Sequence, residues 1–241
     1  MTPILIVALG LLAPPGPVVP DGPTPVALQW SALAATARVS NGLGTAASAS
    51  AVCLGNSKGM AYLLTANHAV PKGEARVYEF FAKDSYPKST RSLTDGEVVV
   101  RIPDADIALV KISIGIDPLP VVRVAGPGQR PKQYPFAAIS VGCPEFSPPL
   151  ARLEKVMGKT LVRRPDDGIA FFWQMAETPI GGMSGGPLLD AEGRLVGVCS
   201  AFQDGKGYFT HLDEVLAGLK RNGYGWLIAP TEPQPAKPNG R

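Results

Sequence analysis

The sequence predicts an all-β protein. From about residue 28, short apolar runs of strand type follow one another, and turn residues interrupt them at fairly regular intervals. Glycine (27 residues) and proline (25 residues) make up more than a fifth of the 241 residues, as expected for short strands joined by many turns. No long segment with a helical apolar period occurs before residue 211. These observations favour a β-barrel or β-sandwich.

The expected strands can be placed along the chain by their apolar runs. The first eight are expected at 34–39, 51–54, 61–65, 76–81, 97–102, 107–114, 121–124 and 136–141. The other five are expected at 160–162, 169–174, 186–189, 195–201 and 207–210. A short helix is expected at 211–220, because acidic residues stand early in this segment and Lys220 stands at its end.

Both ends of the chain differ in composition from the middle. Residues 4–13 are apolar over a length typical of an export signal and too short to span a bilayer, although no basic residue precedes them. We expect an export signal or membrane-targeting segment here, and therefore a periplasmic or secreted protein; a disordered apolar leader is the alternative. Residues 14–27 read as a proline-rich linker and 229–241 as a disordered tail.

The composition of the chain argues against several classes of function. Apolar residues make up 45% and charged residues 18% of the chain, which is typical of a globular protein. The net charge of +3 is too small and scattered to indicate a nucleic-acid partner. Cys53, Cys143 and Cys199 lie in apolar runs without metal-site spacing. We expect buried free thiols, with one disulfide still open, and neither a metal nor a cofactor.

The stretch 181–187 reads Gly-Gly-Met-Ser-Gly-Gly-Pro and places Ser184 on a tight turn. Glycines let the backbone bend sharply and let a substrate carbonyl come close. Backbone N–H groups at such a turn can converge on a developing oxyanion. Ser184 is therefore a candidate nucleophile, and a solvated serine in a glycine-rich turn is the alternative.

A base and an acid stand upstream of this serine. His68 follows an apolar strand, and an imidazole suits proton transfer in both directions near neutral pH. Asp106 opens another apolar strand, and Asp104 lies two residues before it, so spacing alone leaves both acids open. The order His, Asp, Ser is the chain order of the chymotrypsin-type triad.

Three segments, 65–68, 106–109 and 182–187, together resemble the trypsin-like (chymotrypsin-fold) serine proteases. The resemblance covers about residues 32–226 and is closest to the bacterial HtrA/Deg-type catalytic domain without a PDZ domain. It implies two six-stranded antiparallel β-barrels packed face to face, with the active site in the cleft between them and a short C-terminal helix. The first barrel would span 28–118. The second barrel and the helix would span 119–228.

The resemblance also implies a function, that of a serine endopeptidase that hydrolyses polypeptides through an acyl-enzyme. Ser184 would be the nucleophile, His68 the general base and Asp106, which the Asp-Ile-Ala-Leu motif selects over Asp104, the acid that orients His68. The backbone N–H groups of Gly182 and Ser184 would form the oxyanion hole. The substrate-binding residues would be Thr178, Ser200, Ala201 and Phe202, which favour a small or medium apolar side chain before the scissile bond.

Met183 departs from the digestive members of this family, which carry an aspartate there. That aspartate pairs with a newly freed N-terminal amine. Because methionine cannot form this ion pair, we expect no activation by N-terminal cleavage and insertion.

Two other functions remain open at this point. Residues 182–186 also match the G-x-S-x-G motif of α/β-hydrolase esterases, which would require His211 with Asp190 or Asp204 and a fold with long helices. The second alternative is a catalytically weak or inactive trypsin-fold protein that acts as a scaffold for a peptide or partner.

Overall fold

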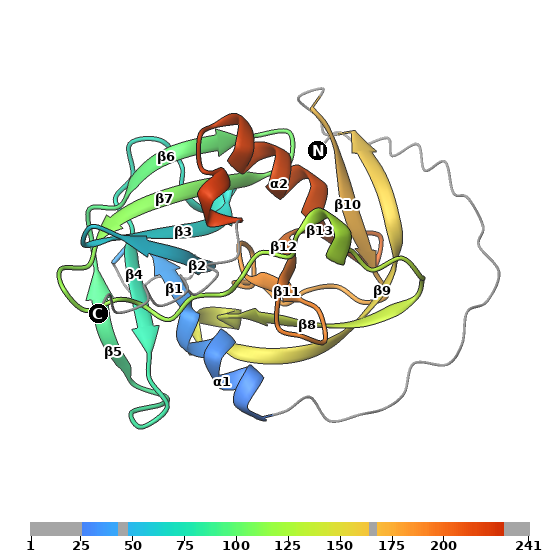
Figure 1. Ribbon diagram of the computed structural model, residues 1–241. Helices are drawn as coiled ribbons and strands as arrows, with labels where there is room; N and C mark the ends of the chain where they lie inside the picture. Colours follow the sequence, from blue (N-terminus) through green and yellow to red (C-terminus); the bar gives the residue numbers. More distant parts are fainter. Residues whose placement is uncertain (1–25, 43–47, 164–167, 229–241) are drawn as a thin grey trace, which may run out of the picture.

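The computed structural model describes residues 26–42, 48–163 and 168–228. The expected export signal and tail lie outside these residues. The strands form two antiparallel β units that lie side by side, β1–β7 in one and β8–β13 in the other (Figure 1). The predicted fold class is therefore confirmed, with the C-terminal helix in place.

The first unit is a seven-stranded sheet in the order β5-β4-β1-β2-β3-β7-β6. Its strands are β1 (Thr36–Ser40), β2 (Ala49–Ser57), β3 (Met60–Ala66), β4 (Val77–Phe81), β5 (Ser89–Leu93), β6 (Glu97–Ile102) and β7 (Ile107–Ser113). It has seven strands where six were expected, because β5 pairs with β4 as a hairpin. The sequence of β5, Ser-Thr-Arg-Ser-Leu, has no apolar alternation that would predict a strand.

The second unit is a closed six-stranded barrel in the order β10-β13-β12-β11-β8-β9. Its strands are β8 (Phe136–Gly142), β9 (Leu150–Arg163), β10 (Ile169–Met175), β11 (Pro187–Leu189), β12 (Leu195–Gln203) and β13 (Lys206–His211). Only 160–162 of β9 was predicted, because charged residues interrupt its apolar positions. The strand predicted at 121–124 is wrong, since Val124 makes a single bridge to Leu195 there.

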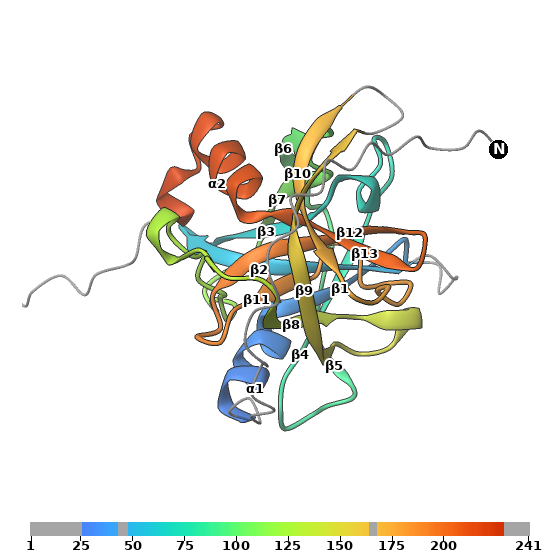
Figure 2. The same cartoon turned by 90° about the vertical axis from the view of Figure 1, so that its right-hand side faces the viewer.

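Two ten-residue helices flank the strands in sequence, one before β1 and one after β13. The helix α1 (Val26–Ala35) was not predicted, because its sequence is apolar all round and lacks a polar face that would reveal a helical period. The helix α2 (Leu212–Arg221) lies within one residue of its predicted bounds. Figures 1 and 2 place α2 at the boundary between the two units. Among the described residues, no helix is long and apolar enough to cross a membrane.

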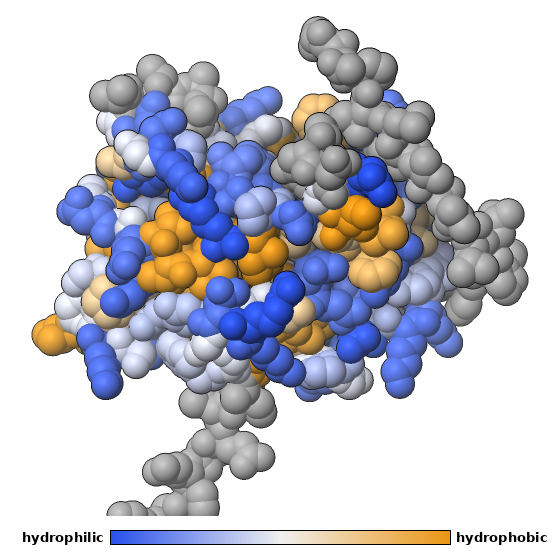
Figure 3. Space-filling model, turned by 90° about the horizontal axis from the view of Figure 1, so that it is seen from above, coloured by the Kyte–Doolittle hydropathy of each residue, from blue (hydrophilic) through white to orange (hydrophobic). Residues whose placement is uncertain are grey.

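The core has two parts. One cluster lies within the first sheet and includes Leu63, Tyr78 and Val110. A larger cluster extends from the first sheet through the second barrel to α2 and includes Leu64 and Trp173. The outer surface is mostly polar with apolar patches, as the face in Figure 3 shows. Because the larger cluster joins both units, their relative position is fixed by buried apolar packing.

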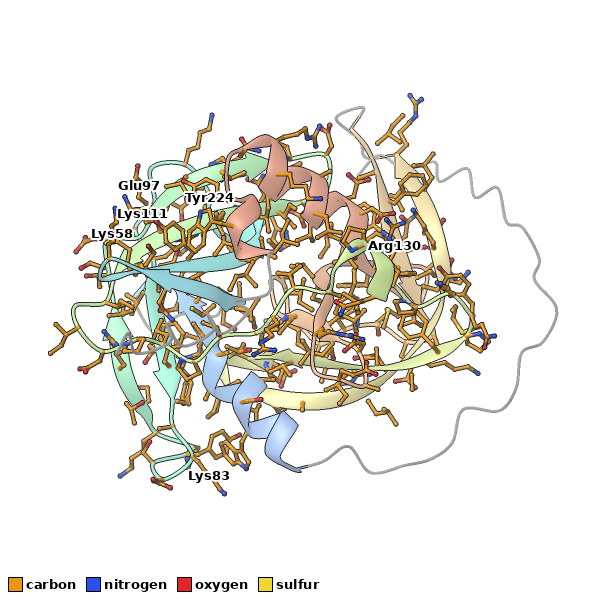
Figure 4. The ribbon with its side chains drawn as sticks, viewed as in Figure 1. Lys58, Lys83, Glu97, Lys111, Arg130 and Tyr224 are labelled. Carbon is orange, nitrogen blue, oxygen red and sulfur yellow. The ribbon has the colours of Figure 1, made fainter. Side chains whose placement is uncertain are left out.

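His211 ends β13 and caps α2. Its ring is buried against Trp173, with centroids 4.0 Å apart, and its Nδ1 accepts a hydrogen bond from the backbone N–H of Asp213. His211 therefore caps the helix from a buried position. Arg130, beside the start of α2 in Figure 4, and Lys159 both pair with Asp213. This position therefore requires a neutral imidazole.

We expect the protonation of His211 to destabilise the fold in mild acid. Burial, and then the charge of Lys159, lower its pKa from 6.5 to about 4. Between these two values the unfolded chain binds the proton and the folded chain does not, so the free energy of unfolding falls as the pH falls through this window. A shift of this size corresponds to roughly 3 kcal/mol.

The measurement is the melting temperature of wild type and His211→Asn between pH 7 and pH 4. Asparagine keeps a capping oxygen but does not titrate, so the variant should lose most of the pH slope. His68→Asn, which alters the chain's other histidine, should keep that slope. An unchanged slope in His211→Asn would contradict the assignment.

Candidate active site

The ends of two neighbouring strands bring His68 and Asp106 together. The strands β3 and β7 pair with Ala66 opposite Ile107, so the residues just after β3 meet those just before β7. A 3-10 turn at Asn67–Ala69 carries His68. The Nδ1 atom of His68 lies 2.8 Å from Asp106 Oδ2, and the backbone N–H of His68 donates to Asp106 Oδ1 at 3.1 Å. The aspartate thus holds the ring and the backbone of the histidine.

Asp106 is a buried carboxylate, with 2% of its surface exposed. Burial raises its pKa, but hydrogen bonds from His68 and Ser200 outweigh burial and hold the pKa below the usual value of 3.8. Its φ of +52° is left-handed, a conformation that aspartate tolerates better than most residues. Asp104, the other candidate, is exposed and lies beside Gly168.

Ser200 links this pair to Ser184. Its hydroxyl donates to Asp106 Oδ2 at 2.6 Å, and its carbonyl oxygen lies 3.4 Å from Ser184 Oγ. The pairing of β12 with β13 shifts register between Cys199 and Ala201, which places a bulge at Ser200. The three predicted triad residues therefore meet around one strand irregularity.

Ser184 is half-buried on a turn that requires glycine. Gly185, with φ of +86°, packs so closely that a Cβ there would collide with the carbonyl oxygen of Ser50 and the hydroxyl of Thr65. Among the described residues, Ser184 Oγ makes no hydrogen bond to His68, and the Nε2 atom of His68 has no partner. Such contacts are often open without substrate and close when it binds.

The backbone before Ser184 forms a type II turn. The N–H of Met183 donates to the carbonyl of Ile180 at 3.2 Å, and Gly182 has the positive φ, +95°, that this turn requires at its third position. The carbonyl of Gly181 accepts a hydrogen bond from the N–H of Glu145 at 2.7 Å. In a trans peptide the N–H of Gly182 points the opposite way. Within the described ranges, neither this N–H nor that of Ser184 donates to another residue, so both are available to a substrate oxygen.

Met183 is fully buried and belongs to the core cluster shared by both units. An apolar side chain thus occupies the place where the digestive family members have an aspartate. Burial in this core anchors the turn that precedes Ser184, because a buried methionine makes many apolar contacts.

The predicted substrate-binding residues lie in two different environments. Ala201 and Phe202 are exposed on β12, and Phe202 is 66% exposed. Thr178 is half-buried, and its carbonyl accepts from Arg152 at 3.2 Å. The side chain of Ser200 is directed at Asp106. This contact could not be predicted from the sequence, since the bulge that turns Ser200 has no signature in an apolar run.

All three cysteines are free and buried, as favoured from the sequence, so the disulfide alternative is wrong. Burial raises the pKa of Cys53 and Cys143 to about 12 and raises that of Cys199 further. These thiols stay protonated at neutral pH and are poor nucleophiles.

The fold of this chain has counterparts among known proteins. The family model of the trypsin-like peptidase domain matches residues 49–198. No curated protein sequence matches the chain significantly. The inactive form of Rv3671c from M. tuberculosis H37Rv is similar, at 18% identity and a TM-score of 0.62, over 91% of this chain and 100% of that one.

Two further solved structures share the fold. The serine endoprotease from Yersinia pestis is 20% identical with a TM-score of 0.62, over 86% of this chain and 68% of that one. The HtrA-type protease AlgW, solved with a tripeptide, is 22% identical with a TM-score of 0.62, over 80% of this chain and 62% of that one.

Proposed function

Because the chain belongs to the trypsin-like peptidase family and is thus a serine endopeptidase, we propose that it cleaves polypeptides with Ser184, His68 and Asp106 as a catalytic triad. The observation that carries this proposal is the position of Asp106. Burying a carboxylate is costly unless it is paired. Both oxygens of Asp106 accept hydrogen bonds from His68, and Oδ2 also accepts one from the hydroxyl of Ser200. The carbonyl of Ser200 in turn contacts Ser184. This is the arrangement that orients an imidazole toward a serine.

The first half of the reaction acylates the enzyme. The hydroxyl oxygen of Ser184 attacks the scissile carbonyl carbon while His68 takes the hydroxyl proton at Nε2. The carbonyl oxygen becomes negative and accepts hydrogen bonds from the N–H groups of Gly182 and Ser184. The carbon–nitrogen bond then breaks, and His68 gives its proton to the leaving amine. An ester between Ser184 and the acyl half of the substrate remains.

The second half removes the acyl group. A water molecule attacks the ester carbon and passes a proton to His68, which returns it to Ser184 Oγ as the carboxylic acid leaves. Asp106 remains ionised throughout and stabilises the imidazolium that forms twice in each cycle. No step requires a metal or an organic cofactor.

We assign Thr178, Ala201 and Phe202, together with the backbone of Ser200, to the region that binds the residue before the scissile bond. A small or medium apolar side chain fits this region, because the exposed Phe202 offers apolar surface to a substrate. The apolar N-terminal run supports export of the protein, with polypeptides of the periplasm or the outside medium as substrates.

The alternatives differ in what they require. The esterase would need His211 as its base, but that ring is buried under Trp173 and caps α2, and the fold is antiparallel β rather than alternating α/β. The inactive scaffold would need the same fold without a reactive serine.

A fluorophosphonate probe separates the protease from the scaffold. Native wild type should be labelled at Ser184, identified by peptide mass, and the heat-unfolded protein should not be. A peptide library digested with wild type and with Ser184→Ala then reports the cleaved bond. Native protein that stays unlabelled, while a known protease in the same tube is labelled, would favour the scaffold.

A further inference from the structure

A row of polar side chains crosses the first sheet and reaches the second barrel. Arg38 on β1 lies directly opposite Ser50 on β2 and opposite Glu79 on β4, so the three side chains share one face of the sheet. The Nε and Nη2 atoms of Arg38 each lie 2.9 Å from Glu79 Oε2. The Arg38 side chain is only 15% exposed, so this ion pair is largely shielded from solvent.

Ser50 contacts the turn that carries the candidate oxyanion hole. Its hydroxyl donates to the carbonyl of Gly182 at 2.9 Å, and its backbone N–H donates to the carbonyl of Ser184 at 2.7 Å. The same hydroxyl accepts from the N–H of Cys143 at 2.9 Å. One residue of the first sheet thus holds the carbonyls of both residues whose N–H groups would form the oxyanion hole.

Arg38 holds the loop behind that turn. Its Nη1 donates to the carbonyl of Phe146 at 2.6 Å, and its guanidinium lies 4.3 Å from the centroid of the Phe146 ring. Glu145 and Phe146 have φ values of +48° and +67°, a left-handed pair that residues other than glycine adopt rarely. This backbone aims the N–H of Glu145 at the carbonyl of Gly181. Arg38 therefore reaches the oxyanion turn through two residues of the loop.

The turn needs such support because its central peptide can adopt two orientations. Types I and II differ by a flip of the peptide between the second and third residues, here Gly181 and Gly182, and glycine permits both forms. The flip would bring the carbonyl of Gly181 to the place that the N–H of Gly182 occupies. The hydrogen bond from Glu145 to that carbonyl favours the present form.

We propose that Arg38 and Ser50 are positioning residues that hold the oxyanion hole of the second barrel from the face of the first sheet. The inference rests on the proposed function, since the N–H groups of Gly182 and Ser184 matter only if they bind the oxyanion of that reaction. Neither side chain acts on the substrate; both act through the backbone of residues 143–146 and 180–184.

The test compares Arg38→Met, Arg38→Lys and Ser50→Ala with Arg91→Met. Lysine keeps the charge beside Glu79 but lacks the planar guanidinium, which donates to the carbonyl of Phe146 and also stacks on its ring. Arg91 is the matched control, because it also bonds carbonyls of a loop, those of Asp117 and Ile114, on the far edge of the first sheet. Circular dichroism and thermal unfolding establish that each variant is folded.

Each Arg38 and Ser50 variant should lower kcat about 10- to 100-fold, part of the loss that removing an oxyanion donor causes. KM should stay within about twofold, because ground-state binding uses other groups. Affinity for a peptide aldehyde, which forms a tetrahedral adduct on the serine, should fall in parallel with kcat/KM. Arg91→Met should keep the wild-type values.

Two outcomes would overturn the inference. One is a folded Arg38→Met enzyme with wild-type kcat and wild-type aldehyde affinity. The other is a crystal structure of that variant in which the N–H of Glu145 still meets the carbonyl of Gly181. The crystal structure tests whether Arg38 holds the turn even if the protein has no activity. Failure of Ser184 to react with a fluorophosphonate would contradict the proposed function alone.

Discussion

Replacing Ser184 with alanine is expected to lower kcat by about a million-fold while leaving the fold intact. The hydroxyl donates one long hydrogen bond, to the carbonyl of Ser200, so its loss removes only a weak contact from that carbonyl and costs the fold little. All covalent catalysis ends with it, and the remaining acceleration comes from substrate binding and the backbone N–H groups.

The same argument predicts how the triad residues combine. His68→Ala alone should cost about as much as Ser184→Ala, and the double variant should cost little more, because a base without a nucleophile has no function. Initial rates on a cleaved library peptide, measured at high enzyme concentration, provide the comparison.

A serine control is available at the other end of the first sheet. Ser113, exposed at the end of β7, should tolerate alanine without a change in kcat. Losses that multiply in the double variant, rather than saturate, would show that Ser184 and His68 act separately.

The local elements that position the triad are largely readable in the sequence. The strands that end at Ala66 and begin at Ile107 are mostly apolar, and the helix after β13 has acidic and basic ends. These signals are local, because side-chain period and end charges depend on a few neighbouring residues. The strand β5 and the helix α1 lack such signals and were missed for that reason.

The contacts of the candidate site that were missed join segments distant in sequence. Ser200 is 94 residues from Asp106, and Arg38 is 108 residues from Phe146. Each is a polar residue between apolar neighbours in a strand, which is a weak signal without knowledge of which segments meet. Register pairs such as Arg38 and Ser50 become informative only once the sheet order is known.

Replacing Asp106 with asparagine is expected to lower kcat about 10,000-fold with a smaller effect on KM. Within the described ranges, the donors to this carboxylate include the backbone N–H of His68, its Nδ1–H and the hydroxyl of Ser200. An amide has a single oxygen and presents N–H groups on its other side. If the amide N–H faces His68, Nδ1 must accept, and the neutral ring carries its proton on Nε2. That tautomer could not take a proton from Ser184.

Asp104→Asn is the matched control, because it makes the same chemical change two residues away on an exposed side chain. It should leave kcat unchanged, which settles by experiment the choice that strand spacing leaves open.

Asp106→Asn also removes a buried charge, so thermal unfolding must accompany the kinetics, and the loss should be expressed per folded molecule. A folded Asp106→Asn enzyme within tenfold of wild-type kcat would mean that Asp106 does not set the tautomer of His68. The triad would then reduce to a serine–histidine pair, and the buried carboxylate would need another explanation, such as anchoring the bulge at Ser200 against the start of β7.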